Sequence, residues 1–373
     1  MEGLVSIVSE QWKGQSVFVT GHTGFKGGWL SLWLHALGAK VHGYALDPQT
    51  DPAFFDVVRV ADTLASDVRA DLADVARLRS ALKAAQPSVV FHLAAQALVR
   101  DSYRDALGTF ATNVMGTANL LEAMRGIASI RAVVLITTDK VYQNREHRQP
   151  YRETDHLGGH DPYSASKAAT EIVAASYRAS FFTGPDAHPA HVATARAGNV
   201  IGGGDWAADR LVPDCLRSFA AAEPVCLRHP DAVRPWQHVL EPLAGYLQLA
   251  QHLLSPEGDR FARAWNFGPD ASSEATVMAV AQILARLWGD GAEVQSIAGN
   301  HPHEAGLLHL DSSAARDALD WHPRWSLEMA LEQTVAWQRA MQRGDDMTAV
   351  SLGQIHAYMA QPCTGRASAE SAG

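Results

Sequence analysis

The chain has 373 residues, 47% of them hydrophobic and 19% charged, with a formal net charge of −9. This length suffices for one large core or two domains, and the negative charge argues against a nucleic-acid or anionic-membrane partner. No apolar run reaches the roughly 18 residues of a membrane-spanning helix, and the N-terminus lacks a basic stretch followed by an apolar one. We therefore expect a cytoplasmic protein.

Strand and helix patterns alternate through the first half of the chain. An apolar, β-rich run at Gln15–Thr20 is followed by glycines, and Trp29–Leu37 has the apolar spacing of a helix. The further predicted strands are Lys40–Leu46, Ser88–Leu93, Ala132–Thr137 and His191–Arg196. The predicted helices between them are Ala73–Ala84, Leu107–Met124 and Ser164–Ser180. This alternation of apolar strands with helices predicts an α/β fold of Rossmann type, a doubly wound parallel sheet with helices on both faces.

Beyond Gly198 the pattern changes to loops rich in Gly, Trp and Pro. A short strand near 262–270 is placed to return to the sheet, while Glu274–Trp288 and Leu327–Gln342 have helical patterns. We predict a Rossmann domain over residues 1–198, joined by the returning strand. A smaller, mostly helical domain over 199–360 and a disordered tail over 361–373 complete the prediction.

A glycine-rich loop, Gly21-His22-Thr23-Gly24-Phe25-Lys26-Gly27, joins the first strand to the first helix. Glycines here permit a sharp turn, close approach of a pyrophosphate to the backbone and tight packing of helix on strand. The amides and partial positive charge of the helix N-terminus favour phosphate groups. Because an ordinary strand-to-helix turn also contains glycine, the loop alone is weak support for a dinucleotide site.

Asp47, about 20 residues after the loop and at the end of the second strand, strengthens this prediction. A carboxylate at this place accepts hydrogen bonds from the adenosine ribose and repels a 2′-phosphate, which favours NAD over NADP. Lys26 is a counterargument, because its ammonium is able to meet such a phosphate. Asp67 and Val68 either bracket the adenine or are solvated residues. Residues 1–198 are thus predicted to bind NAD.

A second motif, Tyr163-Ser164-Ala165-Ser166-Lys167, begins a helix. A spacing of four residues places Tyr163 and Lys167 on one helix face, where the ammonium is expected to lower the pKa of the phenol toward neutrality. A phenol tuned in this way is a usable base. The motif is common by chance, but here it follows a strand ending in Thr137-Thr138-Asp139-Lys140, at the edge where open α/β sheets bind ligands.

Metal and nucleophilic sites receive little support from the sequence. The cysteines, too few and too scattered for a disulfide framework or a zinc site, are Cys215, Cys226 and Cys363. Histidines within motifs, none with carboxylates or cysteines at metal-ligand spacing, are His22, His92 and His238. The nearest approach to a ligand cluster is His301-Pro302-His303-Glu304. We expect no metal site.

Several blocks together resemble the extended short-chain dehydrogenase/reductases that modify sugar nucleotides. They are the glycine loop, HLAAQ (His92–Gln96), NVMGT (Asn113–Thr117), Thr-Asp-Lys (Thr138–Lys140), YxxxK and RAGNV (Arg196–Val200). Four longer blocks resemble the CDP-glucose 4,6-dehydratase branch: GHTGFKGGWLSLWL (Gly21–Leu34), TTDKVYQN (Thr137–Asn144), RAGNVIGGGDW (Arg196–Trp206) and RPWQHVLEPLAGYL (Arg234–Leu247). The resemblance spans about Gln15 to Trp325.

The resemblance implies a redox-neutral dehydration of CDP-glucose with NAD. Tyr163, aided by Thr138 and Lys167, takes the proton of the sugar 4-hydroxyl while C4 gives hydride to NAD⁺. The 4-ketone acidifies the C5 proton, a base removes it, an acid protonates the departing C6 hydroxyl, and the hydride returns to C6. The residues that the resemblance assigns to the cofactor are Gly21, Thr23, Gly24, Phe25, Lys26, Gly27, Asp47, Asp67, Val68, Leu93, Ala94, Ala95, Asn113, Tyr163 and Lys167.

Asp139 and Lys140 supply the two further titratable groups that this reaction needs. Asp139 is assigned as the acid. Lys140 stands where the better-known dehydratases have a glutamate base, although a lysine looks normal in the resembled branch. It acts either as a neutral base, which requires a lowered pKa, or as a charged stabiliser of the enolate. The alternative for both is a solvated ion pair at the strand end.

The second domain is expected to hold the substrate. Asn199 resembles the position that contacts the diphosphate, and Gln96 is also assigned to the substrate. Arg210 and Arg234 are the candidate cations, because guanidinium groups pair well with phosphate oxygens. Trp206 and Trp236 either line the nucleotide pocket or pack in the core. Nothing in the spacing specifies cytosine, which rests on the resemblance.

Two other functions stay open. The first is another enzyme that uses the same Thr, Tyr and Lys: a different nucleotide-sugar 4,6-dehydratase, a 4-epimerase or a reductase. An epimerase or a reductase, however, needs no acid and base beside the Thr. A nucleotide-sensing Rossmann protein without catalysis has no need of Thr138, Tyr163 and Lys167.

A homodimer, or a tetramer, is also implied by the resemblance. In that family the helices after Asn113 and around Tyr163 pair across a dimer. Both helices carry small residues that permit close approach: Gly116, Ala118, Ala165, Ala168, Ala169, Ala174 and Ala175.

Overall fold

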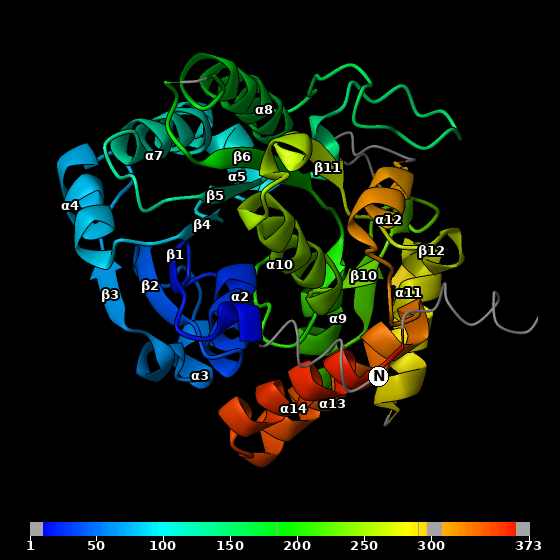
Figure 1. The fold of residues 1–373 in the computed structure, drawn as a ribbon. Helices are drawn as coiled ribbons and strands as arrows, with labels where there is room; N and C mark the ends of the chain where they lie inside the picture. Colours follow the sequence, from blue (N-terminus) through cyan, green and yellow to red (C-terminus); the bar gives the residue numbers. More distant parts are fainter. Residues whose placement is uncertain (1–9, 185, 290, 297–307, 363–373) are drawn as a thin grey trace, which may run out of the picture.

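The computed structural model describes residues 10–184, 186–289, 291–296 and 308–362. At its centre is a seven-stranded parallel sheet with strand order β11-β6-β5-β4-β1-β2-β3 (Figure 1). Its strands are β1 (Ser16–Thr20), β2 (Lys40–Ala45), β3 (Ser66–Arg69), β4 (Val89–His92), β5 (Ala132–Ile136), β6 (His191–Arg196) and β11 (Ala264–Asn266). The order reverses between β1 and β4, which opens a crevice at the carboxyl ends of these strands. The predicted doubly wound α/β fold is confirmed.

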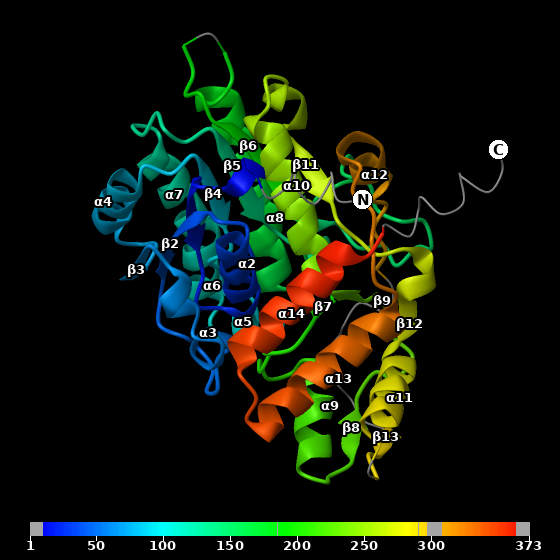
Figure 2. The same ribbon diagram turned by 60° about the horizontal axis from the view of Figure 1, so that its bottom comes forward.

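Helices cover both faces of this sheet (Figures 1 and 2). One face packs against α4 (Val75–Ala85), α7 (Gly116–Met124) and α8 (Pro162–Phe181), and the other against α2 (Phe25–Ala36) and α10 (Leu240–Leu254). The C-terminal helix α14 (Met347–Ala360) packs outside α2. Side chains alternate across a strand, so Phe18 enters the first core while Val17 and Val19 enter the second. This two-sided burial explains why the central strands β1, β4 and β5 are almost entirely apolar.

The remaining elements form a smaller second region and the connections. The region contains β7 (Val200–Ile201), α9 (Leu211–Ala220), β8 (Val225–Leu227), β9 (Val233–Pro235), β10 (Gln237–His238), β12 (Glu274–Thr276), α11 (Val277–Trp288), β13 (Val294–Ser296), α12 (Ser313–Leu319) and α13 (Leu327–Arg343). The connections contain α3 (Phe54–Val57), η1 (Val60–Thr63), α5 (Val99–Arg104), α6 (Ala106–Phe110), η2 (Ala111–Met115), η3 (Asp139–Val141), η4 (Gly258–Phe261) and η5 (Ala271–Ser273). Residues beyond 198 also return to the Rossmann layers, because β11 pairs with β6 and α10 covers the sheet.

Three elements differ from the sequence-based prediction. The helix expected over Leu107–Met124 is interrupted by η2, a π-helical turn. The strand β3 is not among the predicted strands, because this charged, half-exposed strand lies at the sheet edge and lacks an apolar run. The segment Glu274–Thr276 pairs with β9 as a strand, so the predicted helix begins only at Val277.

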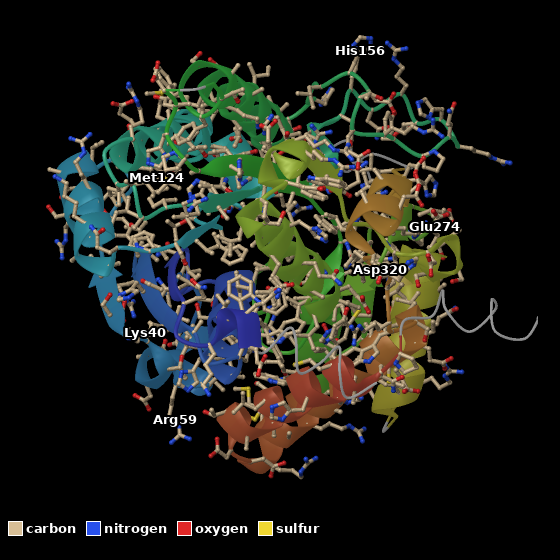
Figure 3. The ribbon with its side chains drawn as sticks, in the orientation of Figure 1. Lys40, Arg59, Met124, His156, Glu274 and Asp320 are labelled. Carbon is tan, nitrogen blue, oxygen red and sulfur yellow. The ribbon has the colours of Figure 1, made fainter. Side chains whose placement is uncertain are left out.

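Side chains fill the space between the sheet and its helices, and charged groups such as Lys40, Arg59 and Asp320 lie at the periphery (Figure 3). In the described part of the chain, no three His, Cys, Asp or Glu side chains are grouped to hold a metal. The helices described contain no stretch long and apolar enough to cross a membrane. The run His301–Glu304, Cys363 and the tail from residue 363 lie outside the described residues.

Candidate active site

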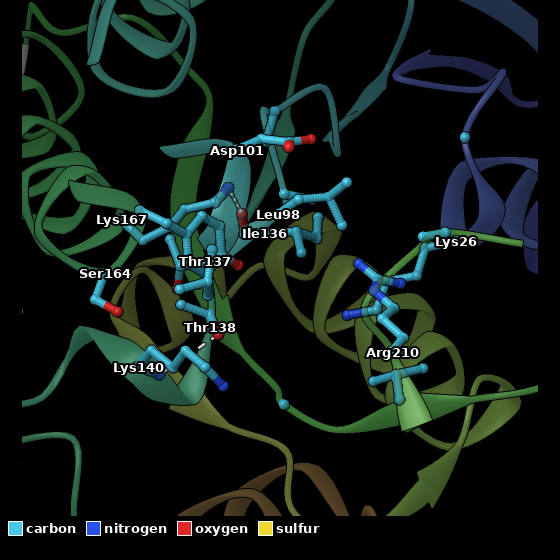
Figure 4. A pocket seen from close by; sticks show the side chains of 18 of the residues that line it. Lys26, Leu98, Asp101, Ile136, Thr137, Thr138, Lys140, Ser164, Lys167 and Arg210 are labelled. Carbon is cyan, nitrogen blue, oxygen red and sulfur yellow. Dashed lines mark hydrogen bonds between the residues drawn. The ribbon is translucent and has the colours of Figure 1, made fainter. Parts of the chain in front are cut away.

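A cavity of about 1870 Å³ opens at the carboxyl edge of the sheet, between the sheet and the second region. Its walls include the glycine loop, the ends of β2, β4 and β5, the start of α8, and residues around α9 and β9. In the close view, Thr138, Lys140 and Lys167 lie on one side of the cavity, and Lys26 and Arg210 lie next to each other on the opposite side (Figure 4). The predicted catalytic and phosphate-binding groups therefore share one space.

The glycine loop has the geometry of a phosphate cradle. Gly21 has a φ of +74°, and a Cβ on it would lie 2.6 Å from the Ala94 backbone nitrogen. A Cβ on Gly27 would overlap the Gly21 carbonyl, so helix α2 and the loop pack without side chains between them. Gly24 begins α2 with no side-chain cap and no acidic residue in the first turn. The first amides of the helix are thus left to an anion, which fits a dinucleotide pyrophosphate.

The adenosine end of the cavity differs in part from the prediction. Asp47 lies at the end of β2 with its side chain 83% exposed, and Arg69 Nη1 is 3.1 Å from its Oδ1. Asp67 and Val68 do not line the cavity, whereas residues 70–72 do. The Asp67 carboxylate is held by Arg69 Nε at 2.7 Å and by the buried His22 Nε2 at 2.8 Å. Asp67 therefore links β3 to the glycine loop through His22. The residues that face the cavity are those that directly follow β3.

Lys26 points into the cavity beside Arg210 (Figure 4). Burial, together with the positive charges of Arg210 and Lys167, lowers the pKa of Lys26 to about 7. Lys26 thus lies beside Arg210, where a diphosphate would meet it, and not at the adenosine end of the cavity. Lys26 therefore no longer argues for the 2′-phosphate of NADP.

Thr138, Asp139 and Lys140 follow β5 directly and form the turn η3. The Asp139 side chain is fully buried: its Oδ1 accepts a hydrogen bond from Thr138 Oγ1 at 2.9 Å and its Oδ2 one from Asn199 Nδ2 at 3.2 Å. Lys140 Nζ lies 3.9 Å from Oδ1 and its side chain is 32% exposed. A Cβ on Gly198 would overlap the Asp139 carboxylate, so this glycine makes the room for it. The pair is therefore built into the cavity and is not a solvated surface ion pair.

Tyr163 and Lys167 lie in the first turns of α8, which Asp161 caps by accepting a 2.9 Å bond from Ser164 N. Burial raises the pKa of Tyr163 to about 12, although the Thr138 hydroxyl acts in the opposite direction. Lys167 Nζ donates to the Ile136 carbonyl at 3.0 Å, and burial lowers the pKa of Lys167 to about 8. The expected lowering of the phenol pKa by Lys167 is therefore wrong for this arrangement, because burial and the nearby Asp139 and Asp161 carboxylates raise the pKa.

A buried ion pair that the sequence analysis missed supports this group from behind. Glu171 accepts hydrogen bonds from Thr137 Oγ1 at 2.6 Å and from Arg196 at 3.0 and 2.9 Å. Arg196 Nη1 also donates to the Tyr142 hydroxyl at 2.8 Å. Glu171 follows Lys167 by one helical turn, so the four-residue spacing was the available signal. The pair ties α8 to the ends of β5 and β6.

The substrate side of the cavity is lined by most of the residues predicted for it. Arg210 Nη1 is 2.8 Å from Asp205 Oδ2, and Arg234 is buried at the wall. Trp206 and Trp236 also face the cavity. Asn199, with a left-handed φ of 50°, lines it while holding Asp139. Asn199, which is predicted to contact the diphosphate, is thus hydrogen-bonded to the candidate acid.

Gln96 and Asn113 do not line the cavity. The Gln96 amide nitrogen donates to the Leu98 carbonyl at 2.9 Å, and Asn113 Oδ1 accepts from the Gln96 backbone at 2.9 Å. Asn113 Nδ2 donates to Ser166 Oγ at 2.8 Å. Asn113 thus connects the loop after β4 to α8, and Gln96 bonds within that loop. The contacts of both side chains here are structural.

The cavity mouth carries an ion pair that sequence reasoning also missed. Arg100, from α5 of the Rossmann part, lies 2.8 Å from Asp209 of the second region, and Arg228 lies 3.1 Å from the same carboxylate. No local pattern indicated this contact, because 109 residues separate its partners.

Comparison with known proteins gives consistent matches over most of the chain. The family model described as GDP-mannose 4,6 dehydratase matches residues 18–334. A CDP-glucose 4,6-dehydratase from Salmonella typhimurium is 50% identical over 350 residues, covering 93% of this chain and 97% of that protein. A dTDP-glucose 4,6-dehydratase from Streptomyces griseus is 30% identical, covering 72% of this chain and 76% of that one.

Solved structures show the same fold. A dTDP-glucose 4,6-dehydratase double mutant from Streptomyces venezuelae, with NAD bound, superposes with a TM-score of 0.75 at 23% identity, covering 88% of this chain and 98% of that one. A UDP-glucose 4-epimerase from Thermus thermophilus in complex with NAD gives a TM-score of 0.73 at 25% identity, covering 87% and 98%. The first of these likenesses bears on the fold alone.

Proposed function

The chain belongs to the GDP-mannose 4,6-dehydratase family, and we propose that it is an NAD-dependent hydro-lyase converting CDP-D-glucose to CDP-4-dehydro-6-deoxy-D-glucose. One observation carries this proposal. Thr138, Asp139, Lys140 and Tyr163 meet at one cavity, between a phosphate cradle and a pair of arginines. The choice of CDP-glucose rests on the 50% identity with the Salmonella enzyme.

When bound in this cavity, NAD would supply the hydride chemistry that the reaction needs at C4 and C6. The uncapped N-terminus of α2 and the close-packed Gly21 and Gly27 are the groups that would hold its pyrophosphate. The exposed carboxylate of Asp47 is the acceptor for the ribose hydroxyls.

The chain's own side chains handle the protons. Tyr163 Oη receives the proton of the C4 hydroxyl, and for this its pKa has to fall below the value of about 12 that burial imposes in the free protein. The buried Lys167 ammonium nearby favours that change. Asp139 gives a proton to the C6 hydroxyl, and Lys140, which reaches both solvent and the cavity, takes the C5 proton.

The diphosphate is assigned to the opposite wall. Arg210 and Lys26 are side by side there (Figure 4). Arg234, which is buried, also lines the cavity. Asp205 holds the Arg210 guanidinium in place at 2.8 Å. Charge-assisted hydrogen bonds of this kind orient the sugar toward Thr138.

Incubation with CDP-, dTDP-, GDP- and UDP-glucose and a catalytic amount of NAD⁺ tests the function. We expect the 4-keto-6-deoxy product from CDP-glucose without net reduction of NAD⁺. Stoichiometric formation of NADH would identify a dehydrogenase. If the keto product formed only from dTDP-, GDP- or UDP-glucose, the assignment of CDP-glucose as the substrate would be wrong. A 4-epimer without loss of water would identify an epimerase.

We also propose that the protein is a homodimer. Leu107 on α6, Met115 on η2 and Ile172 on α8 are 84%, 56% and 61% exposed, and these elements pack side by side. Such a group of exposed apolar side chains is typical of an interface. Three of the small residues expected there, Gly116, Ala168 and Ala174, are buried inside the subunit, so the large side chains carry the proposal.

Light scattering after size exclusion tests this. Ile172→Glu is expected to give monomers, while Lys83→Glu, on the exposed face of α4, leaves the mass unchanged. Identical masses for the wild type and Ile172→Glu would contradict this interface.

A further inference from the structure

Asp209 is a carboxylate on the nucleotide side of the cavity that the proposed reaction does not use. It lines the cavity and directly precedes Arg210, which is assigned to the diphosphate. Its backbone has a left-handed φ of 63°, a conformation that Asp adopts more readily than most residues. Because 32% of its side chain is exposed, Asp209 is accessible to a ligand that lies beside that diphosphate.

Two arginines hold one oxygen of this carboxylate. Arg100 Nη1 donates to Asp209 Oδ1 at 2.8 Å, and Arg228 Nη1 donates to the same oxygen at 3.1 Å. Within the described residues, Asp209 Oδ2 accepts no hydrogen bond. The two guanidinium groups thus fix the carboxylate through Oδ1 and leave Oδ2 as an acceptor for a ligand.

Asp205 is the other carboxylate that lines the cavity from residue 199 onward in the described chain. Its Oδ2 accepts from Arg210 at 2.8 Å, and its Oδ1 accepts from the Ala207 amide at 3.1 Å. The guanidinium groups of Arg210 and Arg234 on this side of the cavity are donors and accept nothing. Of the two carboxylates, Asp209 is therefore the one with an oxygen left for a ligand that donates a hydrogen bond.

Pyrimidine bases differ in the group that such an acceptor would meet. Cytosine carries a 4-amino group, which is a hydrogen-bond donor, where uracil and thymine carry a carbonyl oxygen. A carboxylate oxygen accepts from the amine and repels the carbonyl, so one Asp is able to favour cytosine and to disfavour the other two bases.

Resting on the proposed function, we propose that Asp209 Oδ2 accepts a hydrogen bond from the 4-amino group of cytosine and thereby selects CDP-sugars. The diphosphate lies between the glucose and the nucleoside. A glucose at Thr138 and a diphosphate at Arg210, on opposite sides of the cavity, therefore place the base on the Asp209 side (Figure 4). Arg100 and Arg228 are positioning residues, because they act on the base only through Asp209.

Binding of free nucleotides tests this contact without requiring turnover. The probes are CDP, UDP and the diphosphate of the 2-pyrimidinone ribonucleoside, which keeps N3 of cytosine but lacks the 4-amino group. Saturating NAD⁺ occupies the adenosine end of the cavity. By calorimetry, the wild type is expected to bind CDP about 10- to 100-fold more tightly than the other two, the size typical of a hydrogen bond to a charged group.

Asp209→Ala is expected to bind the three nucleotides with similar affinity. An unchanged preference for CDP in this variant would overturn the proposal. Equal affinity of the wild type for CDP and the 2-pyrimidinone nucleotide would overturn it as well.

Two further variants serve as controls, and both are expected to keep the preference for CDP. Asp214→Ala removes a carboxylate on α9 that pairs with Arg217 and lies outside the cavity. Arg100→Ala removes the link to α5, while Arg228 still holds Oδ1. If either variant lost the preference to the same extent as Asp209→Ala, contact with the base would not be its cause and the proposal would be wrong.

Turnover separates this proposal from the function on which it rests. In Asp209→Asn, the ratio of kcat/KM for CDP-glucose to that for UDP-glucose is expected to fall about 10-fold, because the Asn amide offers a donor to uracil as well as an acceptor to cytosine. A keto product from CDP-glucose with an unchanged ratio overturns the role of Asp209 alone. An Asp209-dependent preference for CDP in binding, without any keto product, supports the contact and overturns the dehydratase function.

Discussion

The two walls of the cavity are built differently. The wall that carries Thr138, Asp139 and Tyr163 consists of a strand end and the first turns of a helix, and its polar groups are buried and paired, with Glu171 and Arg196 behind them. The wall that carries Arg210 is the irregular segment before α9, where Arg210 and Asp209 are each about one-third exposed. Buried networks of this kind hold groups rigidly, whereas exposed ion pairs contribute little and rearrange easily. We infer that the first wall fixes the chemistry and the second adapts to the nucleotide.

Removing the Tyr163 hydroxyl tests the catalytic wall most severely. Tyr163→Phe is expected to lower kcat by about 10³-fold with little change in KM, because the side chain acts on a proton and not on the diphosphate. Tyr177→Phe, half-buried on the same helix and outside the cavity, serves as the matched control. A loss of less than tenfold would remove Tyr163 from the mechanism.

The support behind this wall is expected to matter for stability. Glu171→Ala leaves the Arg196 guanidinium buried without its carboxylate, and the free energy of unfolding is expected to fall by about 3–5 kcal/mol. Glu122→Ala removes the half-exposed partner of Arg125 and is expected to change it by less than about 1 kcal/mol. Urea denaturation measures both. Similar losses for the two variants would contradict the expectation that the buried ion pair matters more for stability than the half-exposed one.

The nucleotide wall is expected to affect binding more than chemistry. Arg210→Ala removes charge-assisted hydrogen bonds worth about 1.5–3 kcal/mol, so KM for CDP-glucose is expected to rise about 10- to 100-fold, with a smaller change in kcat. Arg217→Ala, an exposed arginine on the adjacent helix, is the control. A fall in kcat alone would place Arg210 at the reacting sugar.

Lys26 should produce the smallest effect, visible as a pH dependence. Its pKa of about 7 in the free protein means that it is mostly charged below pH 7 and mostly neutral above. A charged Lys26 attracts the diphosphate, so KM is expected to rise a few-fold as the pH increases from about 6 to 8. Lys26→Arg keeps the charge throughout and is expected to abolish this rise. If the rise persists in Lys26→Arg, another group causes it.

Features carried by neighbouring residues were predictable from the sequence. The strands appear as uninterrupted apolar runs because both faces of the sheet are buried. The glycine loop and the Tyr163–Lys167 spacing are local as well, and they line the cavity as predicted. The four-residue step from Lys167 to Glu171 was equally visible, but nothing in it indicated that Arg196 would lie opposite.

Predictions that depended on contacts between distant segments were less successful. Asp67 was considered for the adenine site, yet it lies within β3, where His22 and Arg69 hold its carboxylate, so it does not line the cavity. Gln96 and Asn113 stand in motifs, but they bond to each other's segments. In each case the side chain's partner was set by packing that the local pattern does not contain.

The sequence by itself determined the fold class, and it predicted the dinucleotide loop and the candidate reacting side chains, because each depends on residues a few positions apart. Only the tertiary structure decided that Asp139 is buried beneath Gly198 and Asn199, with its carboxylate accepting from Asn199 and Thr138. It also decided the pKa of Tyr163, which burial raises. Burial and long-range hydrogen bonds arise when segments some 60 residues apart pack together, and no local pattern specifies them.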